Sequence, residues 1–370
     1  MQATIAVING DGIGPEVVPQ GVKALKAIAR RFEHEFNLVP AQLGYTSWRQ
    51  TGHAASRETI ELCRTSDGIL LGAIGVGQWA HASEDLPPSG GRRQFDRELN
   101  HTCSVRPVKV SSHTIGVSPI KADRIRGTDL VVVRDKSLLN HDRLKHAERT
   151  PRGRLARDTL EFHEDEIVLP LKFAFLLARS RKKKLCLMAQ ASMFATSKLW
   201  AQVFNELAAN YSDVETEVQA PDYCAMQLLR NPPAFDVIVS DSAAMGGMIN
   251  SLAALLMGSV GMGSGTTIGL RDGDSYAAMV QRNGLYEPIH GSADVRAGRG
   301  IVNPIGTVLA AAMLLRYSLG LEQEAQAVER GIEKVLGQGY RTYDIMEPGK
   351  IKVGTDEMGE RIAVAIDAGA

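Results

Sequence analysis

Apolar residues near the start of the chain form short continuous runs that alternate with segments of helical spacing. Residues 4–8 are apolar and rich in Ile and Val, which predicts a buried strand. A helix is predicted to begin at Pro15, because proline suits a first helical turn. Its apolar positions follow the helical period: Val17, Val18, Val22, Leu25 and Ile28.

The same alternation continues along the first hundred residues. Residues 36–44 and 68–74 have the composition of strands, and the segment Ser56–Arg64 between them has one apolar helical face. Strand–helix–strand alternation favours a largely parallel sheet, in which ligands bind at the carboxyl ends of the strands. The loop 72–77 is therefore either part of a site or only a tight turn.

Further elements are predicted in the rest of the chain, whereas residues 84–101 are predicted to form a loop rich in Arg, Gly and Pro. The pattern gives a strand that ends at Arg134, a charged solvated arm at 142–166, a helix Ile167–Ser180 and a strand Leu185–Met188. It also gives helices at Gly246–Gly261 and Ile305–Leu319, and a last helix after Val353. The fold class is α/β with a parallel-rich sheet.

Composition narrows the function. The 42 basic and 42 acidic residues balance, which argues against a nucleic-acid partner. No apolar run reaches the length of a membrane span, and no signal peptide precedes the first strand. Four widely spaced cysteines without a CxxC pair suit reduced thiols, so we expect a cytoplasmic protein.

The stretch 286–304 has the composition of a functional loop, because it combines Gly and Pro residues with Glu287, His290 and Asn303. A surface loop with ordinary turn chemistry is the alternative. A second Gly-rich turn, at 10–14, follows the first strand. Its spacing is G-x-G-x-G rather than the G-x-G-x-x-G of dinucleotide folds, so by itself it is weak support for a nucleotide site.

Three segments together resemble the β-decarboxylating dehydrogenases, the family of isopropylmalate, isocitrate and tartrate dehydrogenases. They are EPIHGSADVRAGRGIVNP at 287–304, INGDGIGPEVV at 8–18 and LLGAIG at 70–75. The resemblance implies a two-lobed fold with a cleft between the lobes. It implies a cofactor lobe of residues 1–101 and 258–370, and a substrate lobe of residues 102–257. It also implies a clasp arm around 140–166 and a homodimer formed through the second lobe.

The resemblance also implies a cofactor site. The matching residues are Ile13, Ala73, Glu287, His290, Gly291, Ser292, Ala293, Asp294, Arg296 and Asn303. Glu287 matches a glutamate near the nicotinamide. NAD-dependent members carry an Asp two residues after the Ala, where this chain has Val295 between Asp294 and Arg296. An Arg near the ribose 2′ position favours NADP by charge, whereas Asp294 favours NAD; we predict NAD and keep NADP open.

The implied substrate and catalytic residues are only partly present. Arg106 and Arg134 match family arginines that bind a substrate carboxylate, and Arg97 stands one residue out of step with a third. The family's proton-donor Tyr falls on His141, which either does acid–base work or is a solvated loop residue. The family's general-base Lys falls on Gln190, which cannot act as a base.

The metal site of the resembling family is also incomplete. Asp222 matches one of its aspartates, but Gly247 and Ser251 replace the other two. A hard divalent cation needs several oxygen ligands, so we expect no Mg²⁺ or Mn²⁺ site.

Two functions remain. The first is a diverged NAD(P)-dependent oxidoreductase that acts on a small carboxylate of the 2-hydroxy acid type, without the usual metal-assisted mechanism. The second is a non-catalytic regulatory or ligand-binding paralogue, which would need a catalytic partner subunit. The retained cofactor loop and arginines favour the enzyme. Residues 84–101, where the family recognises the variable group of its substrate, have no readable counterpart, so the substrate is not identified.

Overall fold

The computed structural model describes residues 1–75, 91–137 and 145–369 of the chain. Ten strands form one central sheet in the order β2-β1-β3-β12-β11-β4-β5-β10-β8-β9. Six of its strand pairs are parallel, and the three pairs around β11 and β4 are antiparallel. The sequence-based prediction of an α/β fold with a parallel-rich sheet is confirmed.

The strands of the main sheet are β1 (Gln2–Ile8), β2 (Glu35–Ala41), β3 (Gly68–Leu71), β4 (Cys103–Lys109), β5 (Asp129–Asp135), β8 (Lys184–Met188), β9 (Glu215–Gln219), β10 (Val237–Ser240), β11 (Ser264–Ile268) and β12 (Leu285–Pro288). Two small sheets lie outside it. One pairs β6 (Lys145–Thr150) with β7 (Gly153–Asp158), and the other pairs β13 (Tyr340–Arg341) with β14 (Ile351–Lys352).

The helices are α1 (Gly14–Phe32), α2 (Tyr45–Thr51), α3 (Arg57–Thr65), α4 (Arg92–Glu98), α5 (Ala122–Ile125), α6 (Glu164–Arg179), α7 (Ala195–Ala208), α8 (Pro221–Arg230), α9 (Ala243–Leu256), α10 (Tyr276–Met279), α11 (Ile305–Tyr317), α12 (Glu322–Gly337) and α13 (Thr355–Asp367). Single 3₁₀ turns are η2 (Ile115–Val117), η5 (Ala209–Tyr211), η6 (Pro232–Ala234), η7 (Val260–Met262), η8 (Asp294–Arg296) and η9 (Tyr343–Ile345). In the described part of the chain, none of the helices is long and apolar enough to cross a bilayer.

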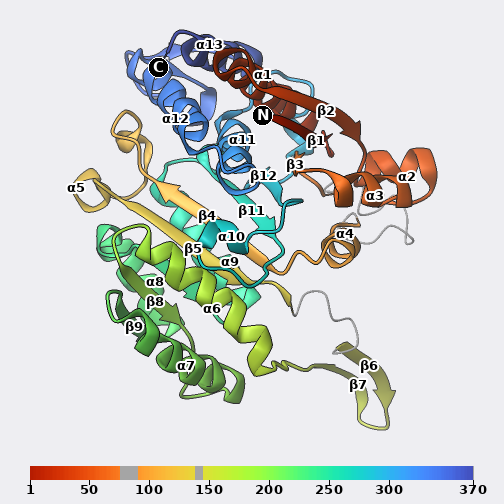
Figure 1. The fold of residues 1–370 in the computed structure, drawn as a ribbon, viewed down its shortest axis with the longest axis vertical. Helices are drawn as coiled ribbons and strands as arrows, with labels where there is room; N and C mark the ends of the chain where they lie inside the picture. Colours follow the sequence, from red (N-terminus) through yellow and green to blue (C-terminus); the bar gives the residue numbers. More distant parts are fainter. Residues whose placement is uncertain (76–90, 138–144, 370) are drawn as a thin grey trace.

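Most of the longer helices gather in two groups toward the two ends of the sheet, whereas α2, α3 and α4 lie to one side of it (Figure 1). Helices α1, α11, α12 and α13 lie beside the strands at the β1 end, and α6–α9 lie around β8, β9 and β10. The strands of residues 1–101 and 258–370 fill one half of the sheet, and those of 102–257 fill the other, with β11 and β4 as the adjoining pair. The division of the chain into two lobes stays a prediction.

The period of two in β1 places alternate residues in different apolar clusters. Ile5 packs in the large cluster with α1 and α11, whereas Ala6 and Ile8 join a smaller cluster with α3 and α4. Burial of one large apolar side chain stabilises the fold by about 1.5–3 kcal/mol. Phe95 of α4 is fully buried in the smaller cluster, so α4 is fixed to the sheet by its apolar face.

Helix α4 corrects the prediction of a loop at 84–101, because residues 92–98 are helical. Phe95 and Leu99 are four residues apart and buried on one face, and Arg92 pairs with Asp96 one turn away. The helical spacing of Phe95 and Leu99 was not recognised in the sequence, because the segment is rich in Arg and Gly. The other corrections concern bounds: β2 and β3 end before 44 and 74, and α9 begins at Ala243, where the Ser242 hydroxyl accepts a hydrogen bond from the backbone of Met245.

The predicted solvated arm contains a hairpin. Strands β6 and β7 pair in antiparallel register, separate from the main sheet, and project from the body of the molecule (Figure 1). Its role as a clasp between subunits stays a prediction.

Candidate active site

Four adjacent strands place chemically active side chains on one face of the sheet. Glu287 of β12 lies opposite Gly265 of β11, and Thr267 of β11 lies opposite Ser104 of β4. Ser104 in turn lies opposite Arg134 of β5. Directly opposed residues in antiparallel strands share a face, as do residues two apart in one strand, so Arg106 joins the same face.

Gly265 creates the space for the side chain of Arg106. A Cβ atom at Gly265 would lie 2.3 Å from both Cδ and Nη1 of Arg106. The arginine therefore passes over the glycine and reaches Glu287, where Nη2 donates a hydrogen bond of 3.3 Å to Oε1. A larger residue at 265 would displace Arg106 from this position.

Helix α4 places the side chain of Arg92 over the same face of the sheet. Arg92 donates to both carboxylate oxygens of Glu287, at 2.6 Å and 3.2 Å. Its Nε donates to Asp96 at 2.9 Å, and its Nη2 donates to the Thr267 hydroxyl at 3.0 Å. Burial raises the pKa of Glu287, but the charges of Arg92 and Arg106 outweigh this effect, so its pKa lies below the ordinary value and the carboxylate is ionised.

Lys136, which directly follows β5 and lies two residues after Arg134, completes the network. Its Nζ donates to Asp96 at 2.8 Å and to the Thr267 hydroxyl at 3.4 Å. Burial lowers the pKa of the Lys136 ammonium, and the Asp96 carboxylate only partly offsets this. Asp96 is itself buried, yet Arg92 and Lys136 hold its pKa well below its usual range.

Among the residues that the structure describes, the cations on this face outnumber the carboxylates. Arg92, Arg106, Arg134 and Lys136 face only the carboxylates of Asp96 and Glu287 within the cluster. Nη1 of Arg106 and Nε of Arg134 are buried and have no hydrogen-bond partner in the described part of the chain. Burial and the neighbouring Arg106 lower the pKa of Arg134 to about 10. An unpaired buried cation is costly, so the site is suited to an anion.

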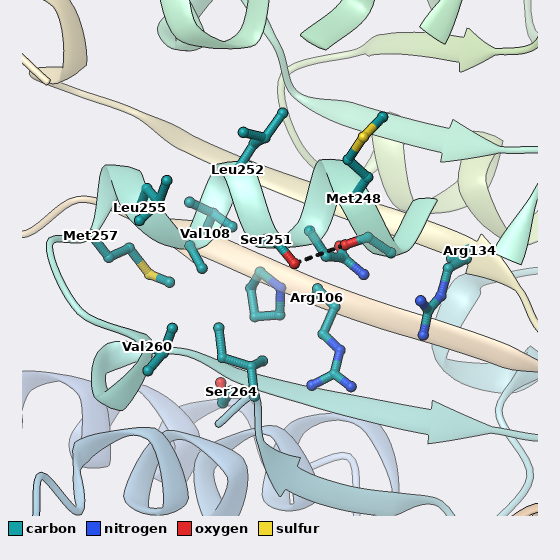
Figure 2. Close-up of a pocket in the computed structure, with 15 residues that line it drawn as sticks. Arg106, Val108, Arg134, Met248, Ser251, Leu252, Leu255, Met257, Val260 and Ser264 are labelled. Atoms are coloured by element: carbon teal, nitrogen blue, oxygen red, sulfur yellow. Dashed lines mark hydrogen bonds between the residues drawn. The ribbon is translucent and has the colours of Figure 1, made fainter. Parts of the chain in front are cut away.

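A cavity of about 480 Å³ opens beside these two arginines, within the range of small-ligand sites. Helix α9 forms one wall, and β4, β11 and η7 form the others. Figure 2 shows Arg106 and Arg134 toward one end of this cavity and Leu255, Met257 and Val260 at the other. Gly247 and Ser251 line it from α9, and the Ser251 hydroxyl donates to the carbonyl of Gly247 at 3.1 Å.

The loop 286–304 meets the Gly-rich turn at the carboxyl end of β1. The backbone N–H of Ile13 donates to the carbonyl of Ser292 at 2.8 Å. Gly12 has φ +56°, and a Cβ there would lie 2.1 Å from that carbonyl oxygen, so glycine is required. Glu16 of α1 accepts hydrogen bonds from the backbone of Gly298 and Gly300, which fixes the far end of the loop.

His290 presents a buried ring nitrogen that lacks a hydrogen-bond partner among the described residues. Nδ1 lies 3.0 Å from the carbonyl of Gly291, and Nε2 is buried without a hydrogen-bond partner among the described residues. Burial lowers the pKa of the imidazole, which is therefore neutral near pH 7. With the Nδ1 proton donated to the carbonyl, Nε2 is an acceptor suited to an amine such as that of adenine.

The residues after His290 differ in their surroundings. Asp294 lies against Gly12, where a Cβ would come within 2.6 Å of Oδ1, whereas Val295 is 70 % exposed. The guanidinium of Arg296 lies over the ring of Tyr343, 5.6 Å from its centroid. Asn303 donates to Asp344 at 3.1 Å and accepts from the backbone of Ile305 at 3.0 Å, so both its groups already bind protein.

Other predicted site residues lie apart from this cluster. Arg97 lines a separate cavity with Asp135 and Cys103, so Arg92 is the arginine that α4 contributes. His141 lies outside the described residues. Gln190 follows β8, where its Nε2 donates to the sulfur of Met193 and its Oε1 is buried without a donor in the described chain.

Among the described residues, the positions that match the metal site of the resembling family supply one carboxylate, which does not by itself fit a divalent ion. Asp222 is exposed at the start of α8, where its side chain accepts from the backbone of Tyr223. In the described ranges, no three His, Cys, Asp or Glu side chains lie close enough to hold an ion. Gly247 contributes no side chain, and the Ser251 hydroxyl donates to its own helix.

Sequence reasoning missed Arg92, Asp96, Lys136 and Thr267 as site residues. Arg92 and Asp96 have the i, i+4 spacing of a helical ion pair, and Lys136 lies two residues after Arg134. The sequence signal for Lys136 was therefore its position two residues after Arg134, because residues two apart in an extended chain lie on the same side. No signal in the sequence alone could place Thr267 beside both cations, because this contact depends on the pairing of β11 with β4.

Comparisons with known proteins agree on one family. The sequence model described as isocitrate/isopropylmalate dehydrogenase matches residues 4–362. The 3-isopropylmalate dehydrogenase of Aquifex aeolicus is 40 % identical over 365 residues, which are 97 % of this chain and 95 % of that protein. The 3-isopropylmalate dehydrogenase of Dehalococcoides mccartyi strain 195 is 39 % identical, with 99 % of this chain and all of that protein covered.

Solved structures agree with the sequence comparisons. Isocitrate dehydrogenase from Methylococcus capsulatus superposes with a TM-score of 0.81 at 25 % identity, over 99 % of each chain. A β-decarboxylating dehydrogenase from Thermococcus kodakarensis superposes with a TM-score of 0.77 at 27 % identity, over 99 % of this chain and 96 % of the other.

Proposed function

Because the chain belongs to the isocitrate/isopropylmalate dehydrogenase family, we propose that it is an NAD(P)-dependent oxidoreductase acting on a small carboxylate of the 2-hydroxy acid type. The observation that carries this proposal is the pair Arg106 and Arg134. Each has a buried donor without a partner among the described residues, and both line a cavity of ligand size. Their planar guanidinium groups suit a carboxylate.

The chain's own residues supply binding and orientation. Arg106 and Arg134 would hold the substrate carboxylate, and Arg92 would hold Glu287 in one orientation beside it. His290 and the backbone of 290–294 would hold the adenine half of the cofactor at the carboxyl end of β1. The cofactor, when bound, accepts or donates the hydride, and the protein fixes its position relative to the substrate carbon.

The reaction would proceed without the metal-assisted chemistry of the family. Metal-assisted decarboxylation requires a cation that polarises the substrate oxygen. Gly247, Ser251 and the single Asp222 do not supply a carboxylate set for such an ion within one chain. We therefore assign no step of the reaction to a metal.

A non-catalytic paralogue is the second candidate. It is favoured by one set of observations: Gln190 stands at the position of the base, and Gly247 and Ser251 stand where carboxylates would be. Such a protein would bind a ligand in the cleft but turn over no substrate alone. The buried, unpartnered Nε2 of His290 favours a protein that binds a cofactor, and hence the enzyme over a purely structural role.

Calorimetric titration with NAD⁺, NADH, NADP⁺ and NADPH tests the proposal, with and without Mg²⁺. We expect micromolar binding of NAD⁺ or NADH that is indifferent to Mg²⁺, and weaker binding of the phosphorylated pair because Asp294 repels a 2′-phosphate. Asp294→Ala should reduce the difference in affinity between the unphosphorylated and the phosphorylated cofactors. Asp158→Ala, in the β6–β7 hairpin, is the matched control and should leave this difference unchanged. Absence of binding for all four cofactors would reject the enzyme and favour the paralogue.

We further propose a homodimer through α8 and α9. Apolar side chains on the outer faces of these helices are exposed, namely Tyr223, Met226, Met245, Met248 and Leu255. A cluster of this kind is typical of a surface that another protein covers. Sedimentation equilibrium should give twice the 40.0 kDa mass of the chain, and a monomer at micromolar concentration would refute the dimer.

A further inference from the structure

We infer that Lys136 is the group that takes the hydroxyl proton of the substrate in this cleft. The inference rests on the proposed function, because it names the base of the same reaction. When a 2-hydroxy acid is oxidised, the hydrogen on C2 leaves as hydride to the cofactor, and the hydroxyl proton leaves to a base. The neutral Nζ amine of Lys136 takes that proton and becomes an ammonium, while C2 becomes a carbonyl carbon.

The other groups near this face are poor bases or do not reach a ligand. Gln190 stands where the resembling family has its general base, and an amide does not accept a proton at neutral pH. The pKa values of Asp96 and Glu287 are held low by neighbouring cations, which makes both carboxylates weak proton acceptors. His101 is fully buried, and its Nε2 lies 2.9 Å from a backbone carbonyl. Among the described residues, Lys136 is therefore the best candidate for the base.

The side chain of Lys136 crosses the sheet toward Arg106. The backbone N–H of Lys136 donates to the Thr102 carbonyl at 2.7 Å, which continues the pairing of β5 with β4. Its Nζ lies 3.4 Å from the Thr267 hydroxyl of β11, so the side chain passes over β4. Arg106 of β4 passes over Gly265 of the same strand β11. Because residues two apart in a strand are separated by about 7 Å, the two cations lie side by side over β11.

This arrangement brings Nζ within reach of the hydroxyl of an acid bound to Arg106. Nη1 of Arg106 is buried and has no partner in the described part of the chain, which makes it a donor for the substrate carboxylate. In a 2-hydroxy acid, C2 and its hydroxyl are attached directly to that carboxylate. Two hydrogen bonds of about 2.9 Å and the short span between carboxylate and hydroxyl oxygens bridge the gap between the two cations.

Lys136 can lose its proton without leaving a buried charge uncompensated. Nζ donates to Asp96 at 2.8 Å, but Nε of Arg92 also donates to Asp96, at 2.9 Å, so the carboxylate keeps a cation. Burial lowers the pKa of the Lys136 ammonium; Asp96 opposes this effect and Arg92 reinforces it. The titratable and charged groups around Nζ are Arg92 and Asp96 of α4, Cys103 and Arg106 of β4, Arg134 of β5, Glu287 of β12, and His101 beside Asp96.

Reductive trapping tests this placement without cofactor or turnover. The full chain is incubated with 2-oxobutanoate and cyanoborohydride, and the labelled lysines are identified by peptide mass spectrometry. A neutral amine beside C2 attacks the keto carbon, loss of water gives an imine, and cyanoborohydride reduces the imine to a secondary amine. Lys136 should be labelled at least about tenfold faster than the exposed Lys352, because the bound keto acid is held next to it. Labelling of Lys352 without Lys136 would overturn the inference.

A ketone without a carboxylate is the matched control for the role of Arg106. Butanone has the carbonyl group of 2-oxobutanoate but no group for the guanidinium to bind, so the preference for Lys136 over Lys352 should disappear. The labelling rate of Lys136 with 2-oxobutanoate should also rise with pH through the pKa of its ammonium, because only the neutral amine attacks. If butanone labels Lys136 as fast as 2-oxobutanoate does, no carboxylate is held beside Nζ, and the inference fails.

The variant Lys136→Arg separates proton transfer from binding. It keeps a cation beside Asp96 but supplies no base, so the affinity for 2-hydroxybutanoate should stay within about threefold of the wild type. The kcat for oxidation of this acid should fall by about 10²- to 10⁴-fold, the usual contribution of a general base. The rise of wild-type kcat with pH toward the pKa of Lys136 should be lost. Lys352→Arg, in the exposed strand β14, is the matched control and should change neither quantity.

An unchanged kcat in Lys136→Arg would place the base elsewhere and overturn the inference. Failure of the proposed function is a separate result, because it appears as absent cofactor binding whatever happens in the trapping experiment. Selective labelling of Lys136 without any cofactor binding would support the placement of the amine beside C2 and reject the dehydrogenase.

Discussion

Replacement of Arg92 by Leu is expected to lower the free energy of unfolding by about 3 kcal/mol. The guanidinium holds both oxygens of Glu287 and one oxygen of Asp96, and all three side chains are largely buried. Removal of one partner from a buried ion pair typically costs roughly 3–5 kcal/mol, because the remaining charge loses its compensation. The lower end applies here because Arg106 still faces Glu287 and Lys136 still faces Asp96.

Urea unfolding of the wild type and the variant measures this effect. Arg64→Leu is the matched control, since Arg64 also pairs with a carboxylate from a helix, but both partners are about half exposed. It should change stability by less than about 1 kcal/mol. The double variant Arg92→Leu with Glu287→Gln should recover part of the loss. If the free energy of unfolding of Arg92→Leu lies within about 1 kcal/mol of the wild-type value, the ion-pair network does not stabilise the packing of α4 on the sheet.

The sequence predicted the architecture because the relevant signals are local. Short apolar runs such as 4–8 and Leu185–Met188 can hardly be other than buried strands, and they alternate with amphipathic helices. Helix α4 was not predicted from the sequence, because its interior is one turn long and its buried Phe95 is surrounded in sequence by Arg, Gln and Asp. Only contact with the sheet makes that helix stable.

The candidate site was predicted less well, since it depends on pairing between distant strands. Arg106, Arg134 and Glu287 were identified through the family resemblance, and the register of β12, β11, β4 and β5 brings them onto one face. The ion pairs of Arg92 and Lys136 correspond to no sequence motif, because they depend on how α4 packs across the sheet. The apolar cavity beside α9 follows from Gly247 and Ser251, which the sequence presented only as missing carboxylates.

Replacement of Arg134 by Gln is expected to weaken the binding of 2-hydroxybutanoate, a small 2-hydroxy acid, by about 10- to 100-fold at pH 8. A hydrogen bond to a charged group contributes roughly 1.5–3 kcal/mol, and this arginine has a buried Nε without a partner in the described chain. The variant should change stability little, because the cost of burying the charged guanidinium offsets the loss of its 3.2 Å hydrogen bond to the Ala243 carbonyl. Weaker binding together with an unchanged or raised Tm would separate ligand recognition from folding.

The pH dependence gives an independent check on Arg134. Its pKa in the folded protein lies below the ordinary value, so the cation is complete well below pH 10 and is lost as the pH rises through about 10. Wild-type affinity for the acid should therefore fall as the pH rises through about 10, and Arg134→Gln should remove the part of this fall that belongs to Arg134. Lys136, whose pKa burial also lowers, contributes the rest. Lys109→Gln, at the exposed end of β4, is the control for a general loss of positive charge, and its pH profile should match the wild type. If Arg134→Gln binds the acid within threefold of the wild type, the carboxylate is held elsewhere, and the assignment of this face as the substrate site fails.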